Sequence, residues 1–122
     1  MNVHNFLGNG FQEVIYQRAL QLELVSANLD FHREIEMQIY YKDYTEPIGT
    51  RRADFVVEDK VLVELKAVSN LEDVHLAQIL NYLQAYKLEI GLLINFEAKS
   101  LQFKRVINSV KKSAKSFNQQ NQ

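Results

Sequence analysis

The fold of this chain is decided by the stretch Arg52-Ala-Asp54-Phe-Val-Val-Glu58-Asp-Lys60-Val-Leu-Val-Glu64-Leu-Lys66. Two runs of β-branched or aromatic residues flank a polar turn, which predicts a β-hairpin. Side chains alternate between the two faces of a strand, so Glu64 and Lys66 share a face. With the turn centred on Asp59, Asp54 lies directly opposite Glu64, whereas a shift of one residue would separate them. The hairpin therefore predicts two carboxylates and an ammonium on one sheet face.

The rest of the chain predicts helices and strands on both sides of this hairpin. Apolar residues recur at three- and four-residue spacing in residues 11–28 and 71–87, which is typical of amphipathic helices. Alternation at 31–41 predicts a strand, and the continuous apolar run at 90–96 predicts a buried strand parallel to the second hairpin strand. The remaining expected elements are a loop at 42–49 and hairpin strands at about 51–57 and about 61–67. Residues 101–110 fit either an edge strand or a last helix, and we favour a strand at 102–107.

These elements define an α/β fold in the order helix, strand, strand, strand, helix, strand. We expect a mixed sheet of about four to five strands flanked by two helices. The 122 residues suit one domain, placed at 1–110. Residues 111–122 are polar and are expected to form a frayed tail.

Composition narrows the class of protein further. Apolar residues make up 47% of the chain, and the formal net charge of −1 produces no strong overall field, although a local groove can still be basic. The absence of cysteine excludes disulfides and thiolate metal sites and suits the cytoplasm. No apolar run approaches the length of a membrane span, and no signal peptide is expected.

Two motifs together resemble a known group of proteins. Asp54 followed by Glu64-Leu65-Lys66 is similar to the pattern of the PD-(D/E)XK nuclease-like superfamily. Gly10-Phe-Gln-Glu13-Val-Ile-Tyr16 resembles the signature of the GxxExxY family within it, and the likeness covers about residues 3–108. This resemblance implies a restriction-endonuclease-like core. One departure is the short stub Asn2 to Leu7, where family members usually carry a longer helical lead-in.

The resemblance also implies a function and a set of site residues. The reaction would be metal-dependent phosphodiester hydrolysis of nucleic acid. Asp54, Glu64 and the backbone carbonyl of Leu65 would hold the metal, with Glu13 as a further ligand. Lys66 would position or deprotonate the attacking water and Gln78 would orient it. Residues Tyr16 and Tyr82 would contribute to binding.

Charge alone supports a cation at this place. Three carboxylates would meet one ammonium if Glu13, Asp54, Glu64 and Lys66 converge. Carboxylates held close together raise each other's pKa unless a cation joins them. Oxygen ligands suit a hard divalent ion, so the expected cofactor is Mg²⁺, with Mn²⁺ as a second possibility.

Blander interpretations of the same residues stay open at this point. Glu13 fits a solvated helix carboxylate, and Tyr16 and Tyr82 fit core residues. Alternating charges are common on any half-solvated strand. A non-catalytic module that keeps the fold and binds nucleic acid or a protein partner would explain the sequence as well, and so would a structural homo-oligomer whose polar stripe is an interface.

Overall fold

The computed structural model describes residues 2–97 and 101–108 of the chain. The predicted tail at 111–122 lies outside the described residues. The elements in chain order are α1 (Asn2–Leu7), α2 (Glu13–Ser26), β1 (Phe31–Tyr40), β2 (Pro47–Val57), β3 (Val61–Lys66), α3 (Asp73–Tyr86), β4 (Ile90–Asn95) and β5 (Gln102–Ile107).

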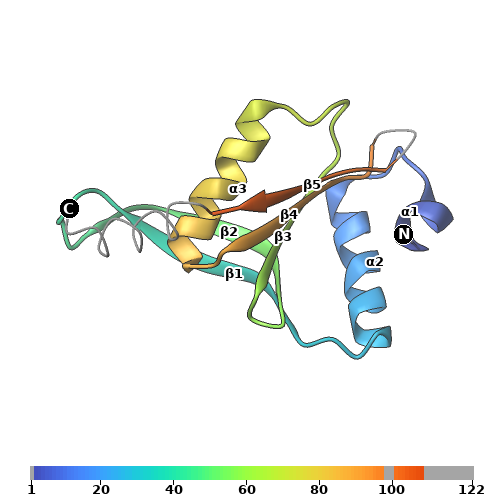
Figure 1. Cartoon of the computed structure of the whole chain (residues 1–122), viewed down its shortest axis with the longest axis horizontal. Helices are drawn as coiled ribbons and strands as arrows, with labels where there is room; N and C mark the ends of the chain where they lie inside the picture. Colours follow the sequence, from blue (N-terminus) through green and yellow to red (C-terminus); the bar gives the residue numbers. More distant parts are fainter. Residues whose placement is uncertain (1, 98–100, 109–122) are drawn as a thin grey trace, which may run out of the picture.

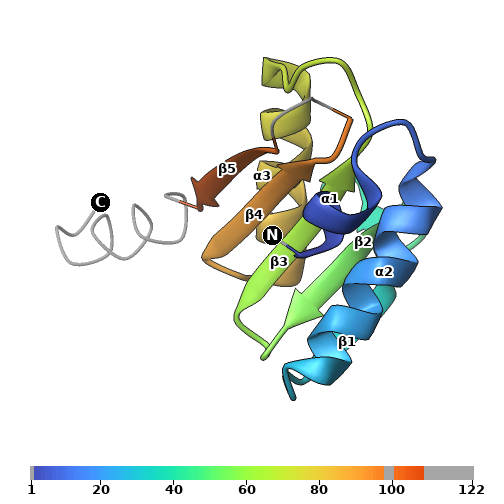
Figure 2. The same cartoon turned by 90° about the vertical axis from the view of Figure 1, so that its right-hand side faces the viewer.

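The strands form one mixed sheet in the order β1-β2-β3-β4-β5. The first three strands are an antiparallel meander, β4 runs parallel to β3, and β5 is antiparallel to β4. Helix α2 covers one face of the sheet and α3, the crossover between β3 and β4, covers the other (Figures 1 and 2). The predicted α/β fold, its element order and the parallel pair are confirmed.

The hairpin has the predicted register. Phe55 pairs with Val63 and Val57 with Val61, so the turn is centred on Asp59. Glu58 and Asp59 both have positive φ, 54° and 53°, as a tight hairpin of right-handed twist requires. The turn thus tolerates two residues without the conformational freedom of glycine, and its polar side chains keep it in solvent.

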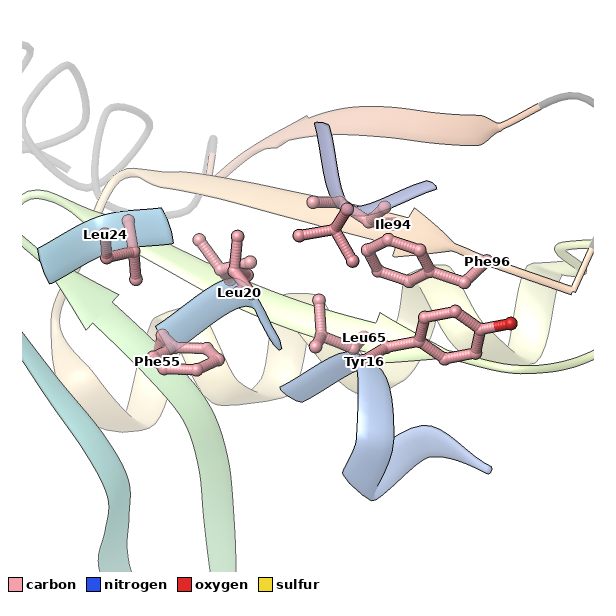
Figure 3. Close-up of a cluster of buried hydrophobic side chains, with 9 residues drawn as sticks. Tyr16, Leu20, Leu24, Phe55, Leu65, Ile94 and Phe96 are labelled. Carbon is pink, nitrogen blue, oxygen red and sulfur yellow. The ribbon is translucent and has the colours of Figure 1, made fainter. Parts of the chain in front are cut away.

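The larger core cluster lies between the sheet and α2 (Figure 3). Helix α2 buries Tyr16, Leu20 and Leu24 on side chains from β2, β3 and β4. The ring of Tyr16 stacks on Phe96 with a centroid separation of 4.5 Å. Val3 of α1 is also buried here, so the short lead-in is a helix that completes this core.

A second cluster lies between the sheet and α3. Ile79 and Leu83 of the helix pack on Leu62 of β3 and Leu93 of β4. A Cβ atom on Gly91 would lie 2.9 Å from the Cδ1 atom of Ile79. The missing side chain at Gly91 therefore lets α3 approach β4 closely.

Several predicted boundaries need correction. Strand β2 begins at Pro47, so it takes up the end of the predicted loop at 42–49. Proline is tolerated there because it is the first residue of the strand. Helix α2 begins at Glu13 rather than at residue 11, and α3 begins at Asp73 rather than at 71. None of the helices in the described part of the chain has the length and apolar character needed to span a membrane.

Candidate active site

The candidate site lies where β2 and β3 separate. Backbone pairing of the two strands ends at Phe55 and Val63. In the next position the carboxylates replace the ladder: the Asp54 N–H donates to Glu64 Oε1 at 3.0 Å, and the Leu65 N–H donates to Asp54 Oδ2 at 2.7 Å. The two predicted carboxylates are therefore cross-strand neighbours, each held by the backbone of the opposite strand.

The alternation of side chains changes at Asp54. Pairing between β1 and β2 omits Glu34 and Asp54, and Glu34 has a φ of 55°. Phe55 belongs to the core under α2, but Ala53, which regular alternation would put on the same face, belongs to the core under α3. At this irregularity the Asp54 carboxylate accepts from the Leu65 N–H, so it lies in the seam between β2 and β3.

Gln17 of α2 holds the Asp54 carboxylate from the other side. Its Nε2 atom donates to Asp54 Oδ1 at 3.0 Å, and its Oε1 atom accepts from Arg33 at 2.7 Å. Arg33 also donates to Gln21 at 2.6 Å. Glu13, Gln17 and Gln21 follow at four-residue spacing, so they form one polar stripe along α2. Sequence reasoning used only Glu13, although this spacing was the signal that could have identified Gln17.

Burial controls the protonation of the two central carboxylates. Glu64 is 6% exposed, and burial together with the charge of Asp54 raises its pKa from 4.5 to about 8. Burial also raises the pKa of Asp54, against the hydrogen bond from Leu65 and the charge of Lys66, which lower it. Among the described residues the ion pairs are His32–Asp59 and Arg52–Glu36, both exposed, so neither central carboxylate has a cation within ion-pair distance.

Lys66 connects the strand end to both helices. Its Nζ atom donates to Gln78 Oε1 of α3 at 3.3 Å. Glu13 begins α2. Burial raises the pKa of Glu13, and the nearby charge of Lys66 offsets only part of this rise. Glu13 and Gln78 therefore both lie near Lys66, at the end of β3.

The two predicted binding tyrosines have different environments. Tyr16 has no exposed surface, and its hydroxyl donates to the Gly8 carbonyl at 2.7 Å and accepts from the Phe11 N–H at 3.1 Å. Tyr16 therefore fixes the glycine turn before α2 and has no surface to offer a ligand. Tyr82 is partly exposed, and burial followed by the charge of Glu64 raises its pKa. Its ring lies 5.1 Å from the Arg51 guanidinium carbon, and its hydroxyl lies within the electrostatic reach of Glu64.

The oxygen donors of this site meet the needs of a divalent cation only in part. Within the described residues, no three acidic or histidine side chains are gathered closely enough to hold a metal. Asp54, which is half-buried, and Glu64, which is buried, nevertheless supply carboxylate oxygens that have no cation within ion-pair distance among the described residues. The Lys66 carbonyl accepts from the N–H of Phe96, just beyond β4, and the Leu65 N–H donates to Asp54, so the backbone of Leu65 faces β2. Two carboxylates and a backbone oxygen suit a hard cation.

Two further residues shape the site and were not predicted. Asn95 is fully buried; its side chain accepts from the Val68 N–H at 3.0 Å and donates to the Val68 carbonyl at 2.7 Å, which holds the loop after Lys66. The hydroxyl of Tyr86 accepts from the Ala53 N–H at 3.2 Å and donates to the Ile35 carbonyl. It thereby supports the irregular pairing beside Asp54. Asn95 and Tyr86 are single polar residues within apolar segments, so no periodic pattern in the sequence indicates these two roles.

Comparisons with known proteins agree with this geometry. The family model of the PD-(D/E)XK nuclease superfamily matches residues 1–106, so the chain belongs to this superfamily. Its α/β fold is the restriction-endonuclease-like fold. Nucleases of this superfamily generally use divalent metal ions. No curated protein matches the chain.

Two solved structures have a similar fold. The crystal structure of SSO0001 has a TM-score of 0.62 and 17% sequence identity, over 82% of this chain and 52% of that one. An alkaline exonuclease from Laribacter hongkongensis has a TM-score of 0.55 and 10% identity, over 80% of this chain and 57% of that one. The chain thus spans little more than half the length of either protein.

Proposed function

We propose that this protein is a metal-dependent nuclease of the GxxExxY family that hydrolyses phosphodiester bonds in nucleic acid. The observation that carries the proposal is the pair of adjacent carboxylates, the buried Glu64 and the half-buried Asp54, with Lys66 one strand period beyond Glu64. This is the arrangement that gives the superfamily its name. Structural likeness to an exonuclease supports the fold and is consistent with the proposal.

The GxxExxY spacing has a physical explanation in this chain. Gly10 has a φ of 99°, which favours glycine. Tyr16 closes the turn through its two hydroxyl hydrogen bonds. Glu13, between them, begins α2 at the sheet end that carries Lys66. The motif therefore combines two structural residues with one site residue.

Each site residue is assigned a role in the proposed reaction. Asp54, Glu64 and the Leu65 carbonyl would hold Mg²⁺ or Mn²⁺, and Glu13 would be a further ligand, directly or through water. When bound, such an ion polarises the phosphoryl oxygen and lowers the pKa of water. Gln17 keeps the Asp54 carboxylate oriented, because it donates to the oxygen that Leu65 leaves free.

Lys66 and Gln78 would act on the substrate and the attacking water. The ammonium of Lys66 would neutralise charge that develops on the phosphate and would position the water, or the neutral amine of Lys66 would deprotonate the water. Gln78 restrains that ammonium through its hydrogen bond and would orient the water or the phosphate. Both residues belong to rigid elements, β3 and α3, so the groups are held in place before the substrate arrives.

The proposal is tested by cleavage of end-labelled DNA and RNA oligonucleotides with Mg²⁺, with Mn²⁺ and with chelator. Wild type is expected to cleave only with metal. Lys66→Ala should lose at least ~100-fold in rate. Lys60→Ala, in the exposed hairpin turn, removes the same charge and should retain cleavage.

Circular dichroism and thermal unfolding establish whether Lys66→Ala remains folded. Cleavage that survives in a folded Lys66→Ala variant would show that the assigned role is wrong. Metal-independent binding of nucleic acid without any cleavage would favour the non-catalytic module.

A further inference from the structure

A groove lies beside the candidate site, between α3 and the ribbon that β1 and β2 form. The two strands extend beyond the rest of the sheet, and α3 lies against the ribbon near its base (Figure 1). A cavity of about 640 Å³ opens here. Its lining includes Ile39 and Tyr40 of β1, Arg51 of β2, and Gln84 of α3 with Lys87 just beyond it.

This groove continues from the candidate site through Tyr82. The charge of Glu64 acts on the Tyr82 hydroxyl, and the ring of Tyr82 lies under the Arg51 guanidinium. Arg51 in turn lines the groove. Tyr82 is therefore in contact with Arg51 of the groove and within the electrostatic reach of Glu64.

The groove combines cationic, aromatic and apolar surface. Arg51 and Lys87 are cationic, and none of the described lining residues is acidic. The Nε atom of Arg51 is buried and has no hydrogen-bond partner in the described part of the chain. Tyr40 is 51% exposed, and its hydroxyl is held by Gln38 at 2.7 Å, which restrains the ring.

We propose that this groove binds a single-stranded segment of the nucleic-acid substrate, with Arg51 and Lys87 on phosphates and the ring of Tyr40 against a base. The proposal rests on the proposed function, since it names the strand that would lead to the candidate site. Single strands are bound by cationic grooves with aromatic side chains on which bases stack. A duplex would keep its bases paired and would leave Tyr40 without that contact.

The dimensions of α3 agree with a short strand. Lys66 is held by Gln78, and Lys87 directly follows the helix. At ~1.5 Å per residue, Gln78 and Lys87 are about 13 Å apart along the axis. Stacked nucleotides in one strand are ~3.4 Å apart. A nucleic-acid strand held at Lys66 would therefore reach Lys87 within about four nucleotides.

The test measures binding without catalysis. Fluorescence anisotropy with a labelled oligonucleotide of about 12 nucleotides is recorded with chelator, over a range of salt concentrations. Arg51→Gln and Lys87→Asn should each weaken binding of single strands and reduce the salt slope by about 0.7. Asparagine is used at position 87 because Lys87 has a φ of 58°, which asparagine tolerates.

Matched controls separate the groove from general effects. Arg18→Gln removes an exposed cation on α2 and should leave the salt slope unchanged. Tyr40→Ala should weaken binding about fivefold or more. Tyr44→Ala removes a tyrosine that is 67% exposed and does not line the groove, so it should bind like wild type. A duplex of the same sequence should bind more weakly and should not distinguish Tyr40→Ala from wild type.

The outcomes separate this proposal from the proposed function. If wild type binds single strands and folded Arg51→Gln, Lys87→Asn and Tyr40→Ala bind equally well, the groove proposal is overturned whether or not cleavage occurs. Failure of wild type to bind any single strand overturns it too. Binding that depends on Arg51 and Tyr40, without metal-dependent cleavage, would support the groove and contradict the nuclease proposal.

Discussion

Replacing Glu64 by glutamine should change how stability depends on pH. The carboxyl is 6% exposed and its pKa is raised from 4.5 to about 8 by burial and by Asp54. Below the ordinary pKa, both the folded and the unfolded chain keep the proton. Between pH 4.5 and about 8 only the folded protein keeps it, so stability falls as the pH rises through this interval.

The size of the effect follows from the same interval. Each pH unit costs about 1.4 kcal/mol while the folded and unfolded states differ by one proton, which gives almost 5 kcal/mol as an upper limit. Glu64→Gln keeps an acceptor for the Asp54 N–H and has no proton to lose. We therefore expect the variant to match wild type near pH 4.5 and to be more stable by at least about 2 kcal/mol near pH 8.

Urea unfolding at several pH values without metal measures this difference. Glu46→Gln is the matched control, because Glu46 is exposed in the turn region of the ribbon and should follow the wild-type profile. If wild type and Glu64→Gln differ by a constant unfolding free energy across the interval, the argument from burial is refuted. With Mg²⁺ at ten times its Kd, wild type should gain about 1.4 kcal/mol, and Glu64→Gln should lose most of that gain.

The remaining predictions concern the surroundings of the site. Gln17→Ala should weaken Mg²⁺ affinity about 10-fold or more, measured by calorimetric titration, because Asp54 loses its orienting donor; unchanged affinity would contradict that role. Glu13→Ala should reduce metal-dependent cleavage less than Lys66→Ala does, and an equal loss would argue for direct ligation. Gly91→Ala should destabilise the fold by about 1–3 kcal/mol in urea unfolding, since its Cβ would meet Ile79. Ile79→Val removes the contacting Cδ1 atom, so the double variant should cost less than the sum of the two single changes.

Local patterns were enough to predict most of the fold. Alternation and apolar runs located β1, β3, β4 and β5, and the polar turn set the register that brings Asp54 opposite Glu64. The start of β2 was missed because its first residues are exposed and lack a buried face. Such a segment is a strand only through its pairing with β1.

The motif spacing predicted that Asp54 and Glu64 are cross-strand neighbours, but it did not predict what surrounds them. The irregular pairing beside Asp54 coincides with the positive φ of Glu34, which belongs to another strand and has no local sequence signal. Gln17 acts only because α2 lies across that seam. Tyr16, expected at a binding surface, is interior because its ring fits against Phe96. These properties arise from contacts between elements that lie far apart in the sequence.

The hairpin that holds both central carboxylates also has a consequence for how the molecule folds. Asp54 and Glu64 are ten residues apart in the sequence. The Glu64 carboxylate accepts from the Asp54 N–H, and the Asp54 carboxylate accepts from the Leu65 N–H. Hairpins form within microseconds, whereas contacts distant in sequence must first close longer loops. We therefore expect the two carboxylates to meet early, and Gln17, 37 residues away from Asp54, to join only when α2 docks. Until α2 docks, the two negative charges oppose the collapse that buries them. An acidic refolding buffer protonates these carboxylates, so it should speed the docking of α2.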